Sequence, residues 1–348
     1  MAEIYSSYED HLANSKLKEI IVDYERIPHV RTPTFKAKVS KKFEGVDNIV
    51  IKYLSNKDEA EKILSFNKES RNPHSVIPKI LNSKVGIAPF QDGERYIVVE
   101  EQVEIKEDSI CQNTHELYNY IFDHIDLLED LKEQLGEKVL GEDSKSYDYF
   151  SEKNIERVSI FCSDFYGKSS FNEFTNTAIS DILEERSVKG KSMFEQDISH
   201  GNYHGKNRTN GKKIIDLKSI GPNERQIDLV SLLSTMDHNK SIFPSDKQLM
   251  TLASYKANIP LANKKEVMQE YISLLKLGVW YNAVFAQIAR EEMYLEKPES
   301  ASTMTYIHNA NFFANKLFLT EAYDLLGNST NDFSIDKEED FSLDLKVA

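Results

Sequence analysis

Side chains that could hold a metal ion beside a phosphate group gather between residues 199 and 233. His200, Asn202, Asn207 and Asp216 surround a short hairpin in this segment. Amide and carboxylate oxygens are the ligands that Mg²⁺ prefers, and Mg²⁺ takes few of them from a protein. Phosphoryl-transfer enzymes use oxygen-rich sites of this kind to hold Mg²⁺ against a nucleotide. The segment therefore indicates phosphate chemistry.

The local sequence also predicts how this segment folds. The Asn210-Gly211 step favours a type I′ turn, so a hairpin should separate Asn207 from Asp216. Asp228 then begins the apolar run DLVSLL, which predicts a helix with Asp228 in a structural role as its N-cap.

Size and composition limit the class of protein. The chain has 348 residues, enough for two lobes with separate cores. Its hydrophobic content of 40% and charged content of 29% are typical of a globular protein. The formal net charge of -14 argues against broad, non-specific binding to nucleic acid or to an anionic membrane surface. We therefore expect no nucleic-acid partner and no membrane partner.

Cysteine usage and the N-terminus suggest where the protein works. Cys111 and Cys162 are too few for a disulfide scaffold or a thiolate zinc site, which favours a reducing compartment. Cys162 has apolar neighbours, so we interpret it as a packing residue and not as a nucleophile. The N-terminus lacks the apolar segment of a signal peptide, and we expect no run of the roughly 20 apolar residues that span a bilayer. The prediction is a cytoplasmic protein.

Hydrophobic patterning divides the chain into four parts. Residues 1–30 form an N-terminal extension in which the amphipathic stretch 17–24 predicts a helix. Residues 31–105 predict a small mixed lobe, with two strands in 34–54, a helix at 58–68, an extended segment at 79–90 and a strand at 95–105.

The second lobe, residues 106–326, is predicted to be helical apart from the hairpin segment. Its helices are expected at 116–135, 154–165, 174–186, 247–257, 264–294 and 303–326. The aromatic stripe that begins at Trp280 and Tyr281 has helical spacing and predicts core packing. Residues 327–348 form an acidic tail that could contact a protein partner.

One spacing is specific enough to resemble a known family. The segment His200-Gly201-Asn202-Tyr203-His204, followed by Asn207, Ile214-Ile215-Asp216 and Asp228-Leu229, resembles the catalytic core of the aminoglycoside phosphotransferase and choline kinase-like families. Their pattern runs His-Gly-Asp-x-His-x-x-Asn, a hairpin, Ile-Asp-Phe/Leu and a later Asp-Leu. The resemblance implies an α+β, two-lobed protein-kinase-like fold, with a small antiparallel-sheet N-lobe and a larger helical C-lobe.

The resemblance also implies roles for these residues. His200 and Asn202 would belong to the catalytic loop, Asn207 and Asp216 would bind Mg²⁺, and Asp228 would hold the loop through backbone hydrogen bonds. Asn202 stands where the family carries its catalytic Asp. A neutral amide cannot accept the substrate's proton, and general-base catalysis is typically worth about 10²–10⁴-fold. Asn202 could still orient the acceptor hydroxyl through its amide oxygen.

The N-terminal half would supply the rest of a nucleotide site. By resemblance, Lys52 would bind the phosphates and Glu59 would pair with that lysine, with Glu61 as the neighbouring alternative. The backbone from Glu100 to Val103 would meet the adenine edge. The first hairpin, KKFEGVDN at 41–48, holds one glycine and so lacks a Gly-rich phosphate loop.

Two functions remain open at this point, besides a helical interaction protein with a chance motif. The first is an ATP- and Mg²⁺-dependent phosphotransferase that acts on a hydroxyl of a small molecule, with nucleotide and acceptor as partners. The second is a pseudokinase of the same fold that binds a nucleotide or a protein. Glu291 and Glu292 could receive a cationic acceptor, although an exposed helix face explains them equally well.

Overall fold

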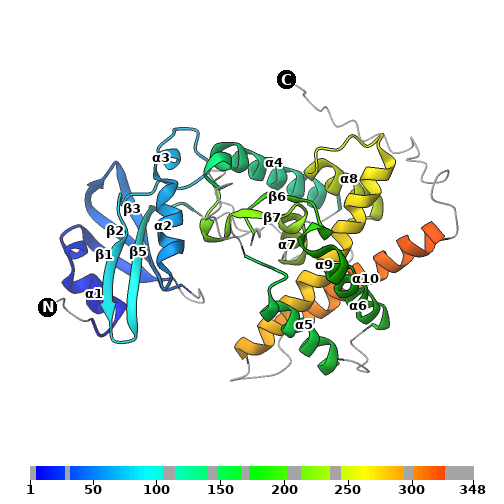
Figure 1. The fold of residues 1–348 in the computed structure, drawn as a ribbon. Helices are drawn as coiled ribbons and strands as arrows, with labels where there is room; N and C mark the ends of the chain where they lie inside the picture. The colour runs from blue at the N-terminus through cyan, green and yellow to red at the C-terminus, as the bar shows by residue number, and fades with distance from the viewer. Residues whose placement is uncertain are drawn as a thin grey trace. The chain divides into compact units, whose positions relative to one another are not determined.

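The computed structural model describes residues 5–27, 32–104, 114–139, 147–165, 172–201, 213–235, 244–293 and 301–325 (Figure 1). The chain forms two compact units. Unit 1 comprises residues 1–148 and 195–239, and unit 2 comprises residues 149–194 and 240–348. This division does not coincide with the predicted lobe boundary near residue 105, because buried residues within 127–135 and 198–220 share a hydrophobic core with the sheet.

Unit 1 is built on a five-stranded antiparallel sheet in the order β1-β2-β3-β5-β4. The strands are β1 (Ile21–Arg26), β2 (Thr34–Phe43), β3 (Val46–Leu54), β4 (Gly86–Phe90) and β5 (Gly93–Glu101). β2 pairs with β3 so that Phe35 lies opposite Ile51. Because successive side chains point to opposite faces, this register directs Phe35, Ile49, Ile51 and Tyr53 to one face, where all are buried.

The first face of the sheet is covered by the N-terminal segment. Helix α1 (Tyr8–Asn14) begins at Ser7, whose side chain accepts the N–H of Asp10, and a 3-10 turn, η1 (Lys16–Glu19), follows. Leu12 of α1 joins the core on this face and is fully buried.

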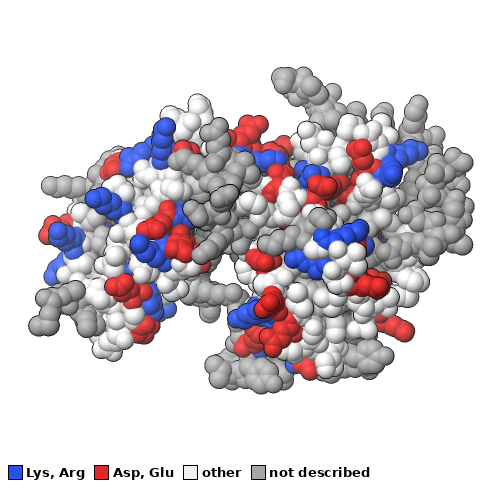
Figure 2. All heavy atoms as spheres, in the orientation of Figure 1, with Lys and Arg blue, Asp and Glu red and all other residues white. Residues whose placement is uncertain are grey.

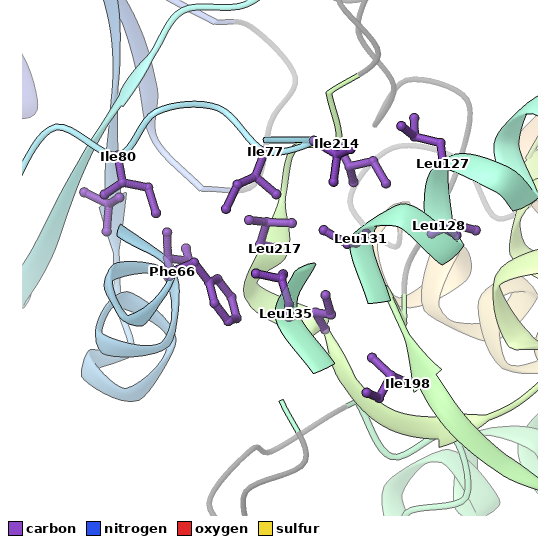
Figure 3. Packing of buried hydrophobic residues seen from close by; sticks show 14 of the residues in the cluster. Phe66, Ile77, Ile80, Leu127, Leu128, Leu131, Leu135, Ile198, Ile214 and Leu217 are labelled. Atoms are coloured by element: carbon purple, nitrogen blue, oxygen red, sulfur yellow. The ribbon is translucent and has the colours of Figure 1, made fainter. Parts of the chain in front are cut away.

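The second face of the sheet packs on helices and on the hairpin segment. α2 (Lys57–Ser65) begins at the N-cap Asn56 and contacts β3 and β5, and α3 (Asn67–Ser70) follows it. The long α4 (Thr114–Val139) contributes leucines to the same hydrophobic core. Figure 3 shows Ile77, Ile214 and Leu217 turned toward Leu131 and Leu135 of α4. This core ties the sheet to the segment that carries the motif.

The motif segment itself contains a two-stranded sheet and a helix. β6 (Gln196–Ser199) pairs antiparallel with β7 (Gly221–Glu224), so that Ser199 lies opposite Gly221. A 3-10 turn, η4 (Leu217–Ser219), precedes β7, and α7 (Ile227–Thr235) follows it.

Unit 2 is helical in its described residues. It contains α5 (Glu152–Phe165), α6 (Glu173–Lys189), the 3-10 turn η2 (Gly190–Met193), α8 (Asp246–Lys256), α9 (Lys264–Met293) and α10 (Ala301–Leu325). Trp280 of α9 is fully buried, stacks on Phe150 and donates its indole N–H to the carbonyl oxygen of Tyr149 at 2.9 Å. The predicted core role of Trp280 and Tyr281 is therefore confirmed.

Helix α9 corrects one expectation about apolar runs. Within the described residues, Lys264–Glu291 is long and apolar enough to cross a membrane by length and composition alone. However, 72% of its most apolar stretch is buried in unit 2, against α5, α8 and α10 among others. Such burial is what the central helix of a folded unit requires.

Most predicted elements are confirmed, including the strands in 34–54 and at 95–105 and all six helices of residues 106–326. The predicted helix at 17–24 is wrong, because Ile21–Arg26 forms β1 and pairs with β2. On the face shown in Figure 2, acidic and basic side chains of the described residues are interspersed.

Candidate functional site

Strands β3 and β5 bring Lys52 and Glu100 together on one face of the sheet. Lys52 lies opposite Val98, and Glu100 is two residues farther along β5, so both side chains point to the same side. Lys52 Nζ is 2.7 Å from Glu100 Oε2, and the two side chains are only 14% and 8% exposed. A buried lysine is thus held by a buried carboxylate.

The charge of Lys52 is stabilised by two acidic residues. Burial alone would lower the pKa of Lys52, but the charges of Glu100 and Asp216 and the hydrogen bond to Glu100 raise it above its ordinary value. Lys52 is therefore expected to carry its charge at neutral pH.

Asp216 has an unusual backbone conformation. Its φ of 65° and ψ of 49° lie in the left-handed region, which non-glycine residues seldom adopt. The neighbours on both sides fix it: Ile214 and Leu217 are buried, and the N–H of Ile214 donates to the carbonyl oxygen of Val76 at 2.6 Å. Residues held in this way are concentrated at functional sites.

A buried carboxylate holds the start of the catalytic-loop motif. Asp228 Oδ2 accepts the backbone N–H of His200 at 2.8 Å, and Oδ1 accepts that of Gly201 at 2.9 Å. His200 is also buried, and its Nε2 lies 2.9 Å from the carbonyl oxygen of Ile215. The implied loop-holding role of Asp228 is confirmed, whereas the N-cap role is wrong, since Asp228 is the second residue of α7.

Gly201 explains why the motif needs glycine after the histidine. Its φ is +78°, and a Cβ atom at this position would lie 2.7 Å from the carbonyl oxygen of Ser219. Both the conformation and the space exclude a side chain. The loop backbone can therefore approach the turn that follows Asp216.

At the end of β5, an ion pair holds the side chain of Glu101, whereas the nearby backbone of Val103 receives no hydrogen bond from the described residues. Lys213 Nζ is 2.9 Å from Glu101 Oε2, which also accepts the backbone N–H of Lys79 at 3.2 Å. Burial would raise the pKa of Glu101, but these hydrogen bonds and charges lower it below its ordinary value. Among the described residues, none hydrogen-bonds the backbone of Val103, so that backbone is available to a ligand.

The expected pairing of Lys52 with Glu59 does not form. Within the described part of the chain, the ion pair of Lys52 is with Glu100, while the charge of Glu59 acts on Lys62 of the same helix. Glu61, the alternative, pairs with Lys57 on the exposed face of α2 at 3.1 Å. Sequence reasoning assigned Glu100 only a backbone role, although a carboxylate in the apolar strand IVVEE was a signal.

The segment at 41–48, which the sequence predicts to be the first hairpin of the sheet, is the second connection between its strands. Because β1 precedes β2, the segment at 41–48 joins β2 to β3, and residues 27–33 join β1 to β2. Thr34 lies opposite Lys52, so the β1–β2 connection begins and ends close to that lysine. Residues 28–31 of this connection lie outside the described residues.

Two predicted site residues, Asn202 and Asn207, lie outside the described residues, as do His204 and the Asn210-Gly211 turn. Among the described residues, no three His, Cys, Asp or Glu side chains cluster as a metal site. A single carboxylate at Asp216 nevertheless fits Mg²⁺, which takes few protein ligands and completes its shell with phosphate oxygens and water. The donor type at Asp216 is therefore compatible with the predicted ion.

A residue that sequence reasoning missed is Lys132 of α4. Its Nζ lies 2.9 Å from Asp197 Oδ2 in β6, three residues before His200. Burial would lower the pKa of Lys132, but Asp197 raises it. Asp197 is thus engaged in an ion pair that joins β6 to α4.

Two candidates in unit 2 have structural explanations. Glu291 accepts three hydrogen bonds from Arg157, the shortest at 2.6 Å, so this carboxylate already has a cation. The side chain of Glu292 lies outside the described residues. Burial raises the pKa of the Cys162 thiol to about 11, which agrees with a packing role and disfavours a nucleophile.

Solved structures with the same fold are small-molecule kinases. A microcompartment-associated aminopropanol kinase is 14% identical, with a TM-score of 0.57 over 90% of this chain and 96% of that chain. Amicoumacin kinase in complex with AMP-PNP, Ca²⁺ and Ami is 11% identical, with a TM-score of 0.56 over 89% and 94%. A choline/ethanolamine kinase family protein from Mesorhizobium loti is 10% identical, with a TM-score of 0.52 over 92% and 95%.

The chain has the small-molecule kinase fold. No protein-family model matches it, and no curated protein matches it in sequence. At identities of 10–14% the likeness concerns the fold, so the resemblance predicted from the motif is confirmed at that level. The charge of Asp216 is one of those that raise the pKa of buried Lys52.

Proposed function

We propose that the protein is an ATP- and Mg²⁺-dependent phosphotransferase that acts on a hydroxyl of a small molecule. The observation that carries this proposal is the charge interaction of buried Lys52 with Asp216. A lone strand lysine and a lone loop aspartate are common, but their approach in this fold is the arrangement that a nucleotide phosphate and its metal ion require.

Each part of the site has a task under this proposal. Lys52 binds phosphate oxygens, and the free backbone of Val103 pairs with the adenine edge at the end of β5. Asp216 and Asn207 hold Mg²⁺, which when bound neutralises charge on the phosphoryl oxygens. Asn202 orients the acceptor hydroxyl, on a loop whose start is held by Asp228.

The acceptor class follows from the neighbours by analogy. The similar structures include an aminopropanol kinase, a choline/ethanolamine kinase family protein and amicoumacin kinase. We therefore infer a small acceptor that carries a hydroxyl group, with amino alcohols and amino sugars as the first compounds to test and plain sugars as the comparison.

Thermal unfolding with and without ATP and MgCl₂ tests the nucleotide part of the proposal. A ligand that binds only the folded state raises the free energy of unfolding, and with it the unfolding temperature. The gain is about 2.7 kcal/mol when the ligand concentration is 100 times Kd. ADP release across the acceptor panel then tests turnover. Asp216→Asn is the matched variant, since it keeps the size of the side chain and removes the charge. The absence of any nucleotide-dependent shift at millimolar ATP would overturn the proposal.

The pseudokinase alternative is favoured by Asn202. It predicts nucleotide binding without ADP release, and a variant Asn202→Asp that still shows no turnover. The phosphotransferase proposal predicts that Asn202→Asp increases turnover, by up to the roughly 10²–10⁴-fold that a general base supplies. A protein partner bound through the acidic tail and a cytoplasmic location both remain predictions.

A further inference from the structure

Glu100 occupies, on strand β5, the role that the resemblance gave to a glutamate on helix α2. We propose that Glu100 is the positioning residue for Lys52 and aims its ammonium group at the phosphates of a bound nucleotide. This inference rests on the proposed function of Lys52 as a phosphate-binding residue.

The register of two neighbouring strands sets the geometry of the pair. β3 lies between β2 and β5 inside the five-stranded sheet, and Lys52 and Glu100 are diagonal neighbours across the β3–β5 ladder. Diagonal positions on one face are within reach of long side chains. The distance of 2.7 Å between Nζ and Oε2 is that of a charge-assisted hydrogen bond. The sheet itself therefore fixes the anchor.

The pair leaves Lys52 able to bind a second group. An ammonium group carries three N–H donors, and Glu100 takes one of them. Among the described residues, the side chain of Lys52 makes no other hydrogen bond or ion pair. Two donors thus remain for phosphate oxygens while the third keeps the side chain oriented.

The charge of the helix glutamate, Glu59, acts on a lysine of its own helix. Glu59 lies one turn from Lys62 on α2, where burial lowers the pKa of Lys62 to about 8 and the charge of Glu59 opposes that shift. In kinases whose lysine is held by a helix glutamate, the position of that helix controls the lysine. In this chain, a shift of α2 should leave the orientation of Lys52 unchanged.

Nucleotide affinity of single variants tests the inference. Isothermal titration with ATP in MgCl₂ is performed on the full-length wild type and on Glu100→Gln, Glu100→Asp and Glu59→Gln. We expect Glu100→Gln to weaken binding about 10-fold, because the charge-assisted hydrogen bond that orients the ammonium group is weakened. Glu100→Asp keeps the charge and should restore part of the affinity, and Glu59→Gln should lose less than Glu100→Gln. Glu94→Gln, an exposed carboxylate on the same strand, is the control with wild-type affinity.

A double variant distinguishes the positioning role of Glu100 from a purely structural role. Lys52→Gln with Glu100→Gln removes both buried charges, so its unfolding temperature should recover relative to Glu100→Gln alone while its affinity for ATP stays low. If Glu100→Gln does not fold, the affinities of Glu100→Asp and Glu59→Gln for ATP show whether Glu100 or Glu59 positions Lys52.

The outcomes distinguish the inference from the function on which it rests. A wild type that binds no MgATP overturns the proposed function. A wild type that binds MgATP, with wild-type affinity in Glu100→Gln or in Glu100→Asp, overturns only the positioning role. A loss in Glu59→Gln that equals or exceeds the loss in the Glu100 variants also overturns it, because the helix glutamate would then be the anchor.

Discussion

The carboxylate of Asp228 accepts the backbone N–H of His200 at 2.8 Å, although His200 lies 28 residues earlier in the chain, and both residues are fully buried. The same carboxylate accepts the N–H of Gly201. A carboxylate has two acceptor oxygens, one for each of these donors, whereas an amide has only one oxygen. His200 and Gly201, at the end of β6, are thus held by one side chain of α7.

Replacing Asp228 by asparagine should destabilise unit 1. The side-chain amide of the Asp228→Asn variant would have a single oxygen, so one buried backbone N–H would lose its partner, at a cost of about 1–3 kcal/mol. The free energy of unfolding from urea titration measures this loss. Asp181→Asn, on the exposed face of α6, is the matched control with wild-type stability. Equal stability of the two variants would show that the Asp228 hydrogen bonds contribute nothing.

Gly201→Ala should be more damaging than Gly190→Ala. Both glycines have positive φ, but an added Cβ at Gly190 meets no atom within 4 Å, whereas at Gly201 it meets the Ser219 carbonyl oxygen at 2.7 Å. The strained conformation alone costs of order 1–3 kcal/mol, and the steric clash adds to it at Gly201. Urea unfolding compares the two variants, and a larger loss in Gly190→Ala would contradict the close approach.

The sequence predicted the helical segments well and one strand wrongly. The long helices of residues 106–326 were predictable because an apolar stripe with a period near 3.6 persists over many turns, as in α9. Residues 17–24 carry apolar side chains at Leu17, Ile20, Ile21 and Tyr24, which also fit helical spacing. Pairing with β2 overrode this local signal, and only the folded sheet supplies that partner.

The sequence suggests candidate site residues where they follow a contiguous motif. Asp216 and Asp228 are candidates because of their spacing from His200, and Lys52 is a candidate because it lies on a predicted strand after a hairpin. The partner of Lys52 could not be predicted, because it depends on the register between β3 and β5, which neither strand encodes alone. The pairing of Lys132 with Asp197 similarly depends on how α4 docks.

Gly278→Ala should destabilise unit 2 although alanine favours helices. Alanine in place of glycine in a helix gains about 1 kcal/mol. Against this, a Cβ on Gly278 would lie 2.4 Å from Cγ of Phe313, where α9 crosses α10. Overpacking of a core typically costs about 1–3 kcal/mol, so the clash should prevail in the unfolding free energy.

A double-mutant cycle with Phe313→Leu tests the cause. Leucine is smaller than the aromatic ring, so the loss in Gly278→Ala should be partly relieved when both changes are present. Strict additivity of the two single losses would show that the α9–α10 approach at Gly278 is looser than the structure indicates.

The buried imidazole of His11 should make the stability of unit 1 depend on pH. His11 Nδ1 lies 2.9 Å from the hydroxyl oxygen of Tyr53, and burial lowers the pKa of His11 below its ordinary 6.5, with Asp10 opposing the shift. The unfolded chain therefore binds a proton at higher pH than the folded chain, so stability is full above pH 6.5 and falls as pH decreases through the folded pKa. His11→Gln cannot be charged and should flatten the dependence of the unfolding temperature between about pH 8 and 5.5, above the ordinary carboxylate range. His74→Gln, at an exposed histidine, should keep the wild-type slope. A wild-type slope in His11→Gln would show that α1 stays docked on the sheet when His11 is protonated.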